Sequence, residues 1–550
     1  MRWKVRLIFF FFTVFLIIVL IKAFIFQVLT ENFFSSSLVV KKELPKRGVI
    51  YDRNGEILAK SQTVFRLYID KKIFKRNEEN IKAIAKELGV EEASIEAKLD
   101  LDRVWVSIVK NLSVQKKQAL ENLSIKGLVF EQELKRVYPE ASLSAHLLGF
   151  VGKNKEGESV GYFGIEGYYD KALQGLAGIV KSQRGGGGLP VLFGIQQIIE
   201  PGKGVELYLT IEKGLQKIVK RRLKEGMEAY GAKIGCITVV NPSTLEILSL
   251  VCLPDYDPNE YYKYPEEYFV NYFVSNSYEP GSIFKPLIVG AALEEGVIEK
   301  DTKVDESGPV TIGDAQINTW DNKYEGEITI TRVLERSSNV GMVRIGEKLG
   351  KKNIWKYLKL YGFFEKTGID LEGEGKSIIK PKGKWYPVDY ATVTFGQGIA
   401  VTPIQMLRAF SAVVNGGELL KPYVVYKVDD GREKLVERKV QRRVLSEKTS
   451  KTLRLMLVKA VENGLVKWKR PEGYSIGGKT GTAQIPIKGR YDPEKTLASF
   501  MGFFPAEKPK ILIMVMLKEP EASPWGSETA APIFFKLVKD LIVYYNILPE

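Results

Sequence analysis

The stretch YEPGSIFKP, from Tyr278 to Pro286, holds a serine and a lysine three residues apart where a helix is expected to begin. A serine hydroxyl is a poor nucleophile at neutral pH and needs a neighbouring base to take its proton. Residues i and i+3 lie on the same face of a helix, so the side chains of Ser282 and Lys285 can meet. The spacing therefore predicts a serine nucleophile activated by a lysine base, which is acyl-transfer chemistry.

The flanking residues predict where this helix begins and ends. Gly281 allows a close approach of backbone before the helix, and Pro286 fits only if the first turn begins near Ser282. An apolar run after Pro286 supplies the buried body, and Gly296 supplies the stop signal. Ser282 then lies at the positive end of the helix dipole, where negative charge on its oxygen is favoured.

Two later stretches add weight, because an isolated S-x-x-K recurs by chance in a chain rich in lysine. The first is SSN, from Ser337 to Asn339, between two helical stretches. Ser and Asn are favoured helix caps, and a capping role can coexist with a chemical one. The Ser337 hydroxyl is able to pass a proton between lysine and leaving group, and the Asn339 amide is able to hold a peptide substrate.

The second stretch is GGKTGTA around Lys479, which is expected to be a strand of an antiparallel sheet. Glycines on both sides of Lys479 let a substrate backbone lie close. A second lysine near Lys285 would lower the pKa of Lys285 by like-charge repulsion and leave part of it neutral. Thr480 and Thr482 offer hydroxyls to a substrate carboxylate, and the backbone N–H groups of Ser282 and Thr482 are expected to form an oxyanion hole.

Other chemistries find less support in the residues present. His146 is the only histidine and lies far upstream of Ser282, so we expect a buried, hydrogen-bonded side chain and not a Ser-His-Asp triad. One histidine and two cysteines cannot build the usual zinc spacings. The glycine-rich run at 184–190 is expected to be a flexible loop, since no G-K-[ST] follows it. We therefore expect no metal and no cofactor.

The chain has 550 residues, enough for two folded units plus extras. Residues 7–29 form a nearly continuous apolar run, about the 20 residues needed to cross a bilayer. Arg2, Lys4 and Arg6 precede it, which predicts a cytoplasmic tail at 1–6, a single-pass anchor in the inner (plasma) membrane and an extracytoplasmic remainder. A cleaved signal peptide is the alternative, but the run is long for one and no small-x-small site follows. With that topology, the net charge of +15 does not indicate nucleic acid binding.

Turn signals and periodicity divide the rest of the chain. We expect a mixed α/β domain at 35–205, a junction of one strand and one long helix at 206–231, and a long domain at 232–550 that ends in strands. The expected fold class is therefore α+β, with an N-terminal transmembrane helix and a C-terminal domain whose antiparallel sheet is flanked by helices.

The two cysteines lie in one expected hairpin that turns at 241–244. An oxidising compartment would permit a disulfide between Cys236 and Cys252. Their offsets from the turn are unequal, however, so we favour two buried thiols.

These motifs resemble those of the class B penicillin-binding proteins, which are membrane-anchored peptidoglycan D,D-transpeptidases, over nearly the whole chain. RGVIYDRNG, RVYP, HLLGFVG and GIEGYYDKALQG resemble the family's N-terminal pedestal, or dimerisation, domain, here residues 35–205. The stretches that resemble its transpeptidase (penicillin-binding) domain, here residues 232–550, are NPSTLEIL, PDYDPNEY, YEPGSIFKP, SSNVG, FGQGIAVTPIQM, GGKTGTAQ, ASFMGFFP and ETAAPIF.

The resemblance implies a reaction in two steps. Ser282, with Lys285 as its base, would attack the penultimate D-Ala carbonyl of a stem peptide and expel the terminal D-Ala. An amine of a neighbouring stem would then resolve the acyl-enzyme into a crosslink, and β-lactams would mimic the donor and remain attached. The family's second motif falls on Ser337 and Asn339, and its third on Lys479, Thr480, Gly481 and Thr482.

The resemblance also implies partners and a cellular role. Neither the length nor the acidic motif of a class A glycosyltransferase domain occurs here, so a polytopic SEDS-family glycosyltransferase in the membrane is the implied partner. SSN together with YEPGS and a compact pedestal resembles the division-specific (septal) type, or its sporulation relative, more than the elongation-specific type. An elongation role, a non-enzymatic scaffold for a glycan polymerase, and a D,D-carboxypeptidase with water as acceptor are the alternatives.

Overall fold

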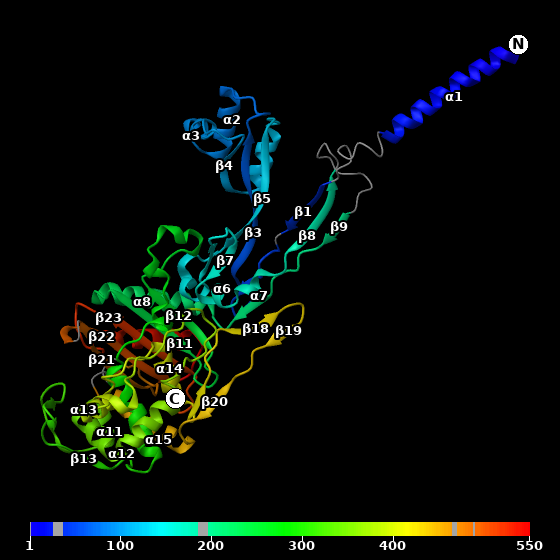
Figure 1. Cartoon of the computed structure of the whole chain (residues 1–550). Coiled ribbons are helices and arrows are strands. Elements are labelled where there is room, and N and C mark those ends of the chain that lie inside the picture. Colours follow the sequence, from blue (N-terminus) through cyan, green and yellow to red (C-terminus); the bar gives the residue numbers. More distant parts are fainter. Residues whose placement is uncertain are drawn as a thin grey trace. The chain divides into compact units, whose positions relative to one another are not determined.

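The computed structural model describes residues 2–25, 37–43, 45–184, 196–464, 470–487 and 490–549 (Figure 1). The chain divides into two compact units. One, here called the N-terminal unit, comprises Met1–Arg47 and Gln174–Gly204, and the other, the main unit, comprises Gly48–Leu173 and Val205–Glu550. The predicted α+β class is confirmed.

The N-terminal unit joins a long helix to a small antiparallel sheet. Its elements are α1 (Arg2–Phe24), β1 (Ser37–Glu43), β8 (Gly178–Arg184) and β9 (Gln196–Ile199), with strand order β1-β8-β9. The helical span Trp3–Phe24 is long and apolar enough to cross a membrane. Residues 26–29 of the predicted anchor and 185–190 of the predicted glycine-rich loop lie outside the described residues.

The first part of the main unit is a sheet with three helices. Its elements are β2 (Ile50–Tyr51), β3 (Ile57–Asp70), α2 (Glu78–Leu88), α3 (Glu92–Leu99), β4 (Trp105–Leu112), α4 (Val114–Asn122) and β5 (Leu128–Val137). Asn77 caps α2 by accepting the N–H of Asn80, and Gly89 ends the helix in a left-handed conformation. The apolar stripe of α2 packs with its two neighbouring helices against β3 and β4.

Three strands from later in the chain extend this sheet. They are β10 (Glu206–Leu209), β18 (Val425–Asp429) and β19 (Glu433–Leu435), and the strand order is β19-β18-β10-β2-β3-β4 with β5 paired to β3. Between β5 and β10 lie short elements: α5 (Ala145–Leu148), β6 (Phe150–Lys153), β7 (Ser159–Tyr162), α6 (Gly164–Tyr168) and α7 (Asp170–Gln174). One sheet therefore joins the predicted pedestal to the C-terminal part of the chain.

A second, fully antiparallel sheet has the order β12-β11-β23-β22-β21. Its strands are β11 (Ile234–Val240), β12 (Ile247–Leu253), β21 (Gly477–Ile487), β22 (Arg490–Phe504) and β23 (Ile511–Lys518). Because side chains alternate along a strand, Ile237 and Val239 pack on one face with α8 (Lys213–Tyr230) and α16 (Ala530–Tyr544). Cys236 and Val240 face the other core.

Helices fill that other core. They are η5 (Gly281–Phe284), α10 (Lys285–Glu294), α11 (Ile330–Glu335), α12 (Asn339–Leu360), α13 (Pro387–Thr392), η7 (Val393–Phe395), α14 (Pro403–Val414) and α15 (Glu447–Glu462). Short strand pairs border them: β13 (Lys303–Glu306) with β16 (Gly326–Thr329), β14 (Val310–Ile312) with β15 (Ala315–Ile317), and β17 (Glu418–Leu420) with β20 (Val440–Arg443). Helix α10 is buried from Lys285 to Ala292, as expected for a helix that is apolar on all sides.

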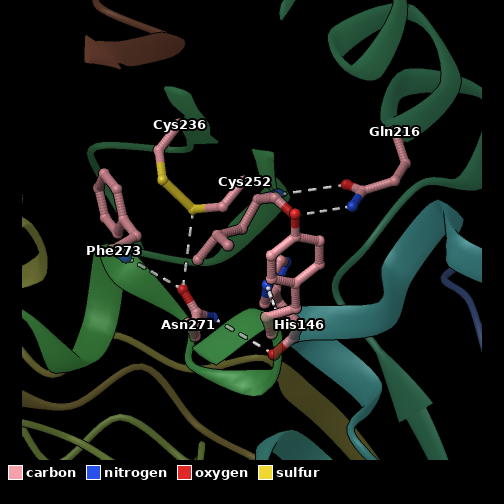
Figure 2. Close-up of a disulfide and its surroundings, with 8 residues drawn as sticks. His146, Gln216, Cys236, Cys252, Asn271 and Phe273 are labelled. Atoms are coloured by element: carbon pink, nitrogen blue, oxygen red, sulfur yellow. Dashed lines mark hydrogen bonds between the residues drawn. A yellow bond between two sulfur atoms is a disulfide. The ribbon is translucent and has the colours of Figure 1, made fainter. Parts of the chain in front are cut away.

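The prediction of two free thiols is wrong, because Cys236 and Cys252 form a disulfide (Figure 2). Strand β12 carries a bulge at Leu248, where Val239 pairs with Ser249 and Val240 with Ile247. This extra residue compensates for the unequal offsets and places the two cysteines directly opposite each other.

The disulfide lies in a well-packed region next to the start of the helical core. Asn271 Oδ1 lies 3.9 Å from Cys252 Sγ and accepts the N–H of Phe273, while its Nδ2 donates to the carbonyl of His146 (Figure 2). Gln216 of α8 donates to the carbonyl of Leu250 and accepts that residue's N–H. The crosslink therefore joins the edge strand β12 to its neighbour β11.

We expect the double substitution Cys236→Ala with Cys252→Ala to lower the free energy of unfolding of the main unit by about 2–3 kcal/mol, since the closed loop is short. Denaturant unfolding of the solubilised full chain, with and without reductant, measures this loss. Reductant is expected to destabilise the wild type and to leave the double variant unchanged. Equal stability of the two proteins without reductant would contradict the crosslink.

Candidate active site

Ser282 lies in the 3-10 turn η5, immediately before α10. The N–H of Lys285 donates to the carbonyl of Ser282, so the predicted helix start is confirmed with a tighter first turn. Gly281 has φ of +58°, and a Cβ there would lie 3.0 Å from the carbonyl oxygen of Thr482. Glycine therefore favours the close approach of β21 to the turn that carries Ser282, because a side chain there would be strained and tightly crowded.

The amine of Lys285 is completely buried and meets the second motif. Its Nζ donates to the carbonyl oxygen of Ser337 at 2.6 Å, to the Ser337 hydroxyl at 3.1 Å and to Asn339 Oδ1 at 2.8 Å. Three oxygen acceptors thus surround one nitrogen, and two of the three predicted motifs are in direct contact.

The residues of SSN have two roles, which are to cap helix α12 and to contact Lys285. Ser338 is the N-cap of α12 and accepts the N–H of Gly341 at 2.9 Å. Ser337, one position earlier, has φ of +60°, which is uncommon for a residue other than glycine. The middle serine therefore caps the helix, and the residues on either side of it are free to face Lys285.

The third motif lies on β21, which packs beside η5. Lys479 is buried, and its Nζ donates to the hydroxyl of Thr480 at 3.2 Å. A side chain at Gly481 would collide with Ser499 Oγ at 2.4 Å, so this position has room only for glycine. The Thr482 hydroxyl accepts the N–H of Gly526 at 3.1 Å.

A cleft of about 100 Å³ brings the three motifs together. Its lining includes five residues predicted from sequence: Ser282, Ser337, Asn339, Thr480 and Thr482. Five further lining residues had no predicted role: Trp320, Phe395, Gln397, Trp525 and Ser527. The rings of Trp320 and Trp525 meet at 5.5 Å between centroids. Phe395 and Gln397 belong to the stretch FGQGIAVTPIQM, whereas no local signal marks either tryptophan.

The electrostatics of the cleft favour a neutral amine at Lys285. Burial lowers the pKa of Lys285 well below its ordinary value, the charge of Lys479 lowers it further, and the carboxylate of Glu306 raises it. Burial also lowers the pKa of Lys479, to about 7. The predicted repulsion by Lys479 therefore acts in the expected direction, but burial is the larger cause.

His146 has the structural role expected from sequence. Its Nε2 lies 2.9 Å from the carbonyl oxygen of Tyr268, its ring packs edge-on against Tyr256, and burial lowers its pKa. The histidine thus belongs to the aromatic surroundings of the disulfide, and a lysine is the base that the cleft offers.

Two family models match this chain. The model described as penicillin binding protein transpeptidase domain matches residues 235–539, and the model described as penicillin-binding protein dimerisation domain matches residues 42–209. Together they cover both halves of the predicted domain organisation.

Individual relatives match over most of the chain. Stage V sporulation protein D of Bacillus subtilis (strain 168) is 34% identical, over 92% of this chain and 79% of its own length. Peptidoglycan D,D-transpeptidase FtsI of Escherichia coli (strain K12) is 28% identical, over 94% of this chain and 86% of its own. The crystal structure of penicillin binding protein 2X from Streptococcus thermophilus superposes with a TM-score of 0.79 at 26% identity, and covers 92% of this chain and 80% of that chain.

We expect Lys479→Ala to move the acid limb of the pH–rate profile for acylation of Ser282 to higher pH. Removing a like charge favours the ammonium form of Lys285, so its pKa rises and more alkaline solution is needed to free the amine. Acylation rates measured across pH for wild type and variant test this. A reduced rate with an unmoved acid limb would contradict the electrostatic role and leave only substrate binding.

Proposed function

This chain belongs to the class B penicillin-binding proteins and is a peptidoglycan D,D-transpeptidase, and we propose that it works through an acyl-enzyme on Ser282. The observation that carries the serine mechanism is the buried Lys285 amine in contact with both Ser337 and Asn339 at the edge of the cleft that Ser282 lines. A lysine with a lowered pKa is able to act as a general base near neutral pH.

In the first step, Ser282 Oγ transfers its proton to Lys285 Nζ and forms a bond to the penultimate D-Ala carbonyl carbon of a donor stem. The backbone N–H groups of Ser282 and Thr482 stabilise the negative charge on the carbonyl oxygen. The C–N bond to the terminal D-Ala then breaks, and its nitrogen receives a proton from Lys285 through the Ser337 hydroxyl. A serine ester and free D-Ala result.

In the second step, the amine of a neighbouring stem attacks the ester carbon. Lys285 takes the proton of the attacking amine and returns one to Ser282 Oγ as the ester bond breaks. The new amide is the crosslink, and the enzyme is restored. Lys479 and the hydroxyls of Thr480 and Thr482 hold the terminal carboxylate of the donor; supporting this, Lys479 reaches Thr480 Oγ1 and both threonines line the cleft.

We assign the pedestal to residues 35–205, the junction to 206–231 and the penicillin-binding transpeptidase domain to 232–550, an assignment supported by the two matched family models. The helix Trp3–Phe24 supports a single-pass anchor in the inner (plasma) membrane, which we orient with its N-terminus in the cytoplasm from Arg2, Lys4 and Arg6. A SEDS-family glycosyltransferase in the same membrane would supply the glycan strands.

We favour a role in the septum or in its sporulation counterpart over one in elongation. The support is the SSN motif with YEPGS and the match to a stage V sporulation protein and to FtsI. Localisation of a fluorescent fusion to the septum, as opposed to the lateral wall, tests this assignment.

Labelling with a fluorescent penicillin tests the serine mechanism. We expect the wild type to be labelled, Ser282→Ala to be unlabelled because the ester cannot form, and Ser527→Ala, which removes another hydroxyl of the same cleft, to retain the label. Gel fluorescence and intact mass give the readout. An unlabelled wild type would favour the scaffold alternative, and a labelled Ser282→Ala variant would place the nucleophile elsewhere.

A donor pentapeptide supplied with and without an acceptor amine separates transpeptidase from carboxypeptidase activity. The crosslinked product is expected to dominate when the acceptor is present. Release of D-Ala by hydrolysis alone would favour the carboxypeptidase alternative.

A further inference from the structure

Arg336 directly precedes Ser337, and both its side chain and its backbone carbonyl form polar contacts. Its guanidinium is almost buried and donates to the carbonyl of Lys323 at 2.6 Å. It also pairs with three acidic side chains, at 2.7 Å from Glu325, 3.3 Å from Glu306 and 3.3 Å from Asp321. The carbonyl oxygen of Arg336 accepts the indole N–H of Trp320 at 3.0 Å. Both the side chain and the backbone of this residue are therefore held.

The residues on either side of Ser337 leave its backbone little freedom. The N–H of Arg336 donates to the carbonyl of Arg332, and the N–H of Ser338 donates to that of Val333. Ser337 is thus a left-handed residue fixed between the last turn of α11 and the cap of α12. A non-glycine residue keeps such a conformation only where its surroundings enforce it. Here that conformation aims the Ser337 carbonyl at Lys285 Nζ.

Glu306 is the least exposed of the acidic partners of Arg336. It lies at the end of β13 with none of its surface exposed to solvent, and its Oε1 has no hydrogen-bond partner among the described residues. Glu325 is by contrast partly exposed and forms a two-pronged contact with Arg332. A buried carboxylate with a free oxygen is costly unless a nearby positive charge balances it. The positive charge that meets it directly is that of Arg336, and the Glu306 carboxylate in turn raises the pKa of Lys285.

We propose that Arg336, with Glu306 as its buried counter-ion, is a positioning residue that holds Ser337 against Lys285 for the acylation step. The proposal rests on the proposed function, in which Lys285 is the base. Arg336 acts through Ser337, because among the described residues the polar partners of its guanidinium lie on β13 and in the segment between β13 and β16. Glu306 has a second effect, since its negative charge acts on Lys285 itself.

The two effects predict different kinetic signatures. Without the guanidinium, Ser337 is free to leave its left-handed conformation, so Lys285 loses its best acceptor and the rate falls at every pH. Without the Glu306 charge, the ammonium form of Lys285 is less favoured, its pKa falls, and the acid limb of the pH–rate profile moves to lower pH. The ionisable groups that act on Lys285 are Lys479 from β21 and Glu306 from β13, and only Glu306 is changed in this test.

The experiment measures the rate of Ser282 acylation by a fluorescent penicillin from acidic to alkaline pH in the full-length solubilised protein. Arg336→Met is expected to slow acylation by about tenfold or more, and Arg336→Lys to recover part of the rate because an amine cannot reproduce the guanidinium fork. Glu306→Gln is expected to move the acid limb to lower pH. Arg332→Met is the matched control, since Arg332 shares Glu325 with Arg336 but lies one helical turn away from Ser337.

Thermal unfolding midpoints show which variants are folded. If Arg336→Met does not fold, the two single variants Arg336→Lys and Glu306→Gln test the positioning role instead. A wild-type rate and pH profile in folded Arg336→Met would overturn the proposal, as would an equal loss in Arg332→Met. So would an unmoved acid limb in Glu306→Gln. A wild-type protein that is not labelled at Ser282 would instead contradict the serine mechanism, so the two failures are distinguishable.

Discussion

The burial of the Lys285 amine is the constraint on which the cleft depends. An ammonium group removed from water is costly unless oxygen acceptors or opposite charges surround it. Here three oxygens from Ser337 and Asn339 meet one nitrogen, and a second buried lysine on β21 adds repulsion. The three contacts hold the amine in position, while burial and the charge of Lys479 lower its pKa. The left-handed backbone of Ser337 follows from the need to place a carbonyl oxygen at that point.

Helix α10 and strand β21 are arranged so that the Lys285 amine is buried next to the cleft. Lys285 is the one charged side chain among the buried residues of helix α10, which is otherwise apolar over its buried length. Strand β21 approaches the turn that carries Ser282 at Gly281, which brings the hydroxyls of Thr480 and Thr482 to the same cleft. The disulfide on the β11–β12 edge stabilises the far side of the sheet that carries β21.

The parts of the site that are marked by short sequence patterns could be predicted from the sequence. Ser282 and Lys285 are separated by one helical turn, the glycines around Lys479 indicate a close backbone approach, and the serines of SSN are common caps. Contacts between distant segments left no such signal. Nothing near Trp320 or Trp525 indicates that their rings meet in the cleft that Ser282 lines. The pairing of Glu306 with Arg336 depends on how β13, which ends at Glu306, pairs with β16. The presence of serine at position 337 also does not indicate a left-handed backbone conformation there.

The fold shows the same division between local and distant effects. Helix α8, the long helix expected in the junction at 206–231, was predictable from its periodicity and from the glycine that ends it. The prediction of two free thiols was wrong because one bulged residue, Leu248, changes the register of β12. The addition of β18 and β19 to the pedestal sheet was not predicted, since β18 lies more than two hundred residues along the chain from β10, the strand through which both join that sheet.

The most direct measurement is a crystal structure of the protein after reaction with a penicillin. We expect an ester at Ser282 Oγ, with Lys285 Nζ within about 3.2 Å of that oxygen and with Ser337 still left-handed and its carbonyl oxygen accepting a hydrogen bond from the amine. An adduct on another residue, or an ester at Ser282 with the Lys285 amine turned away into solvent, would contradict it.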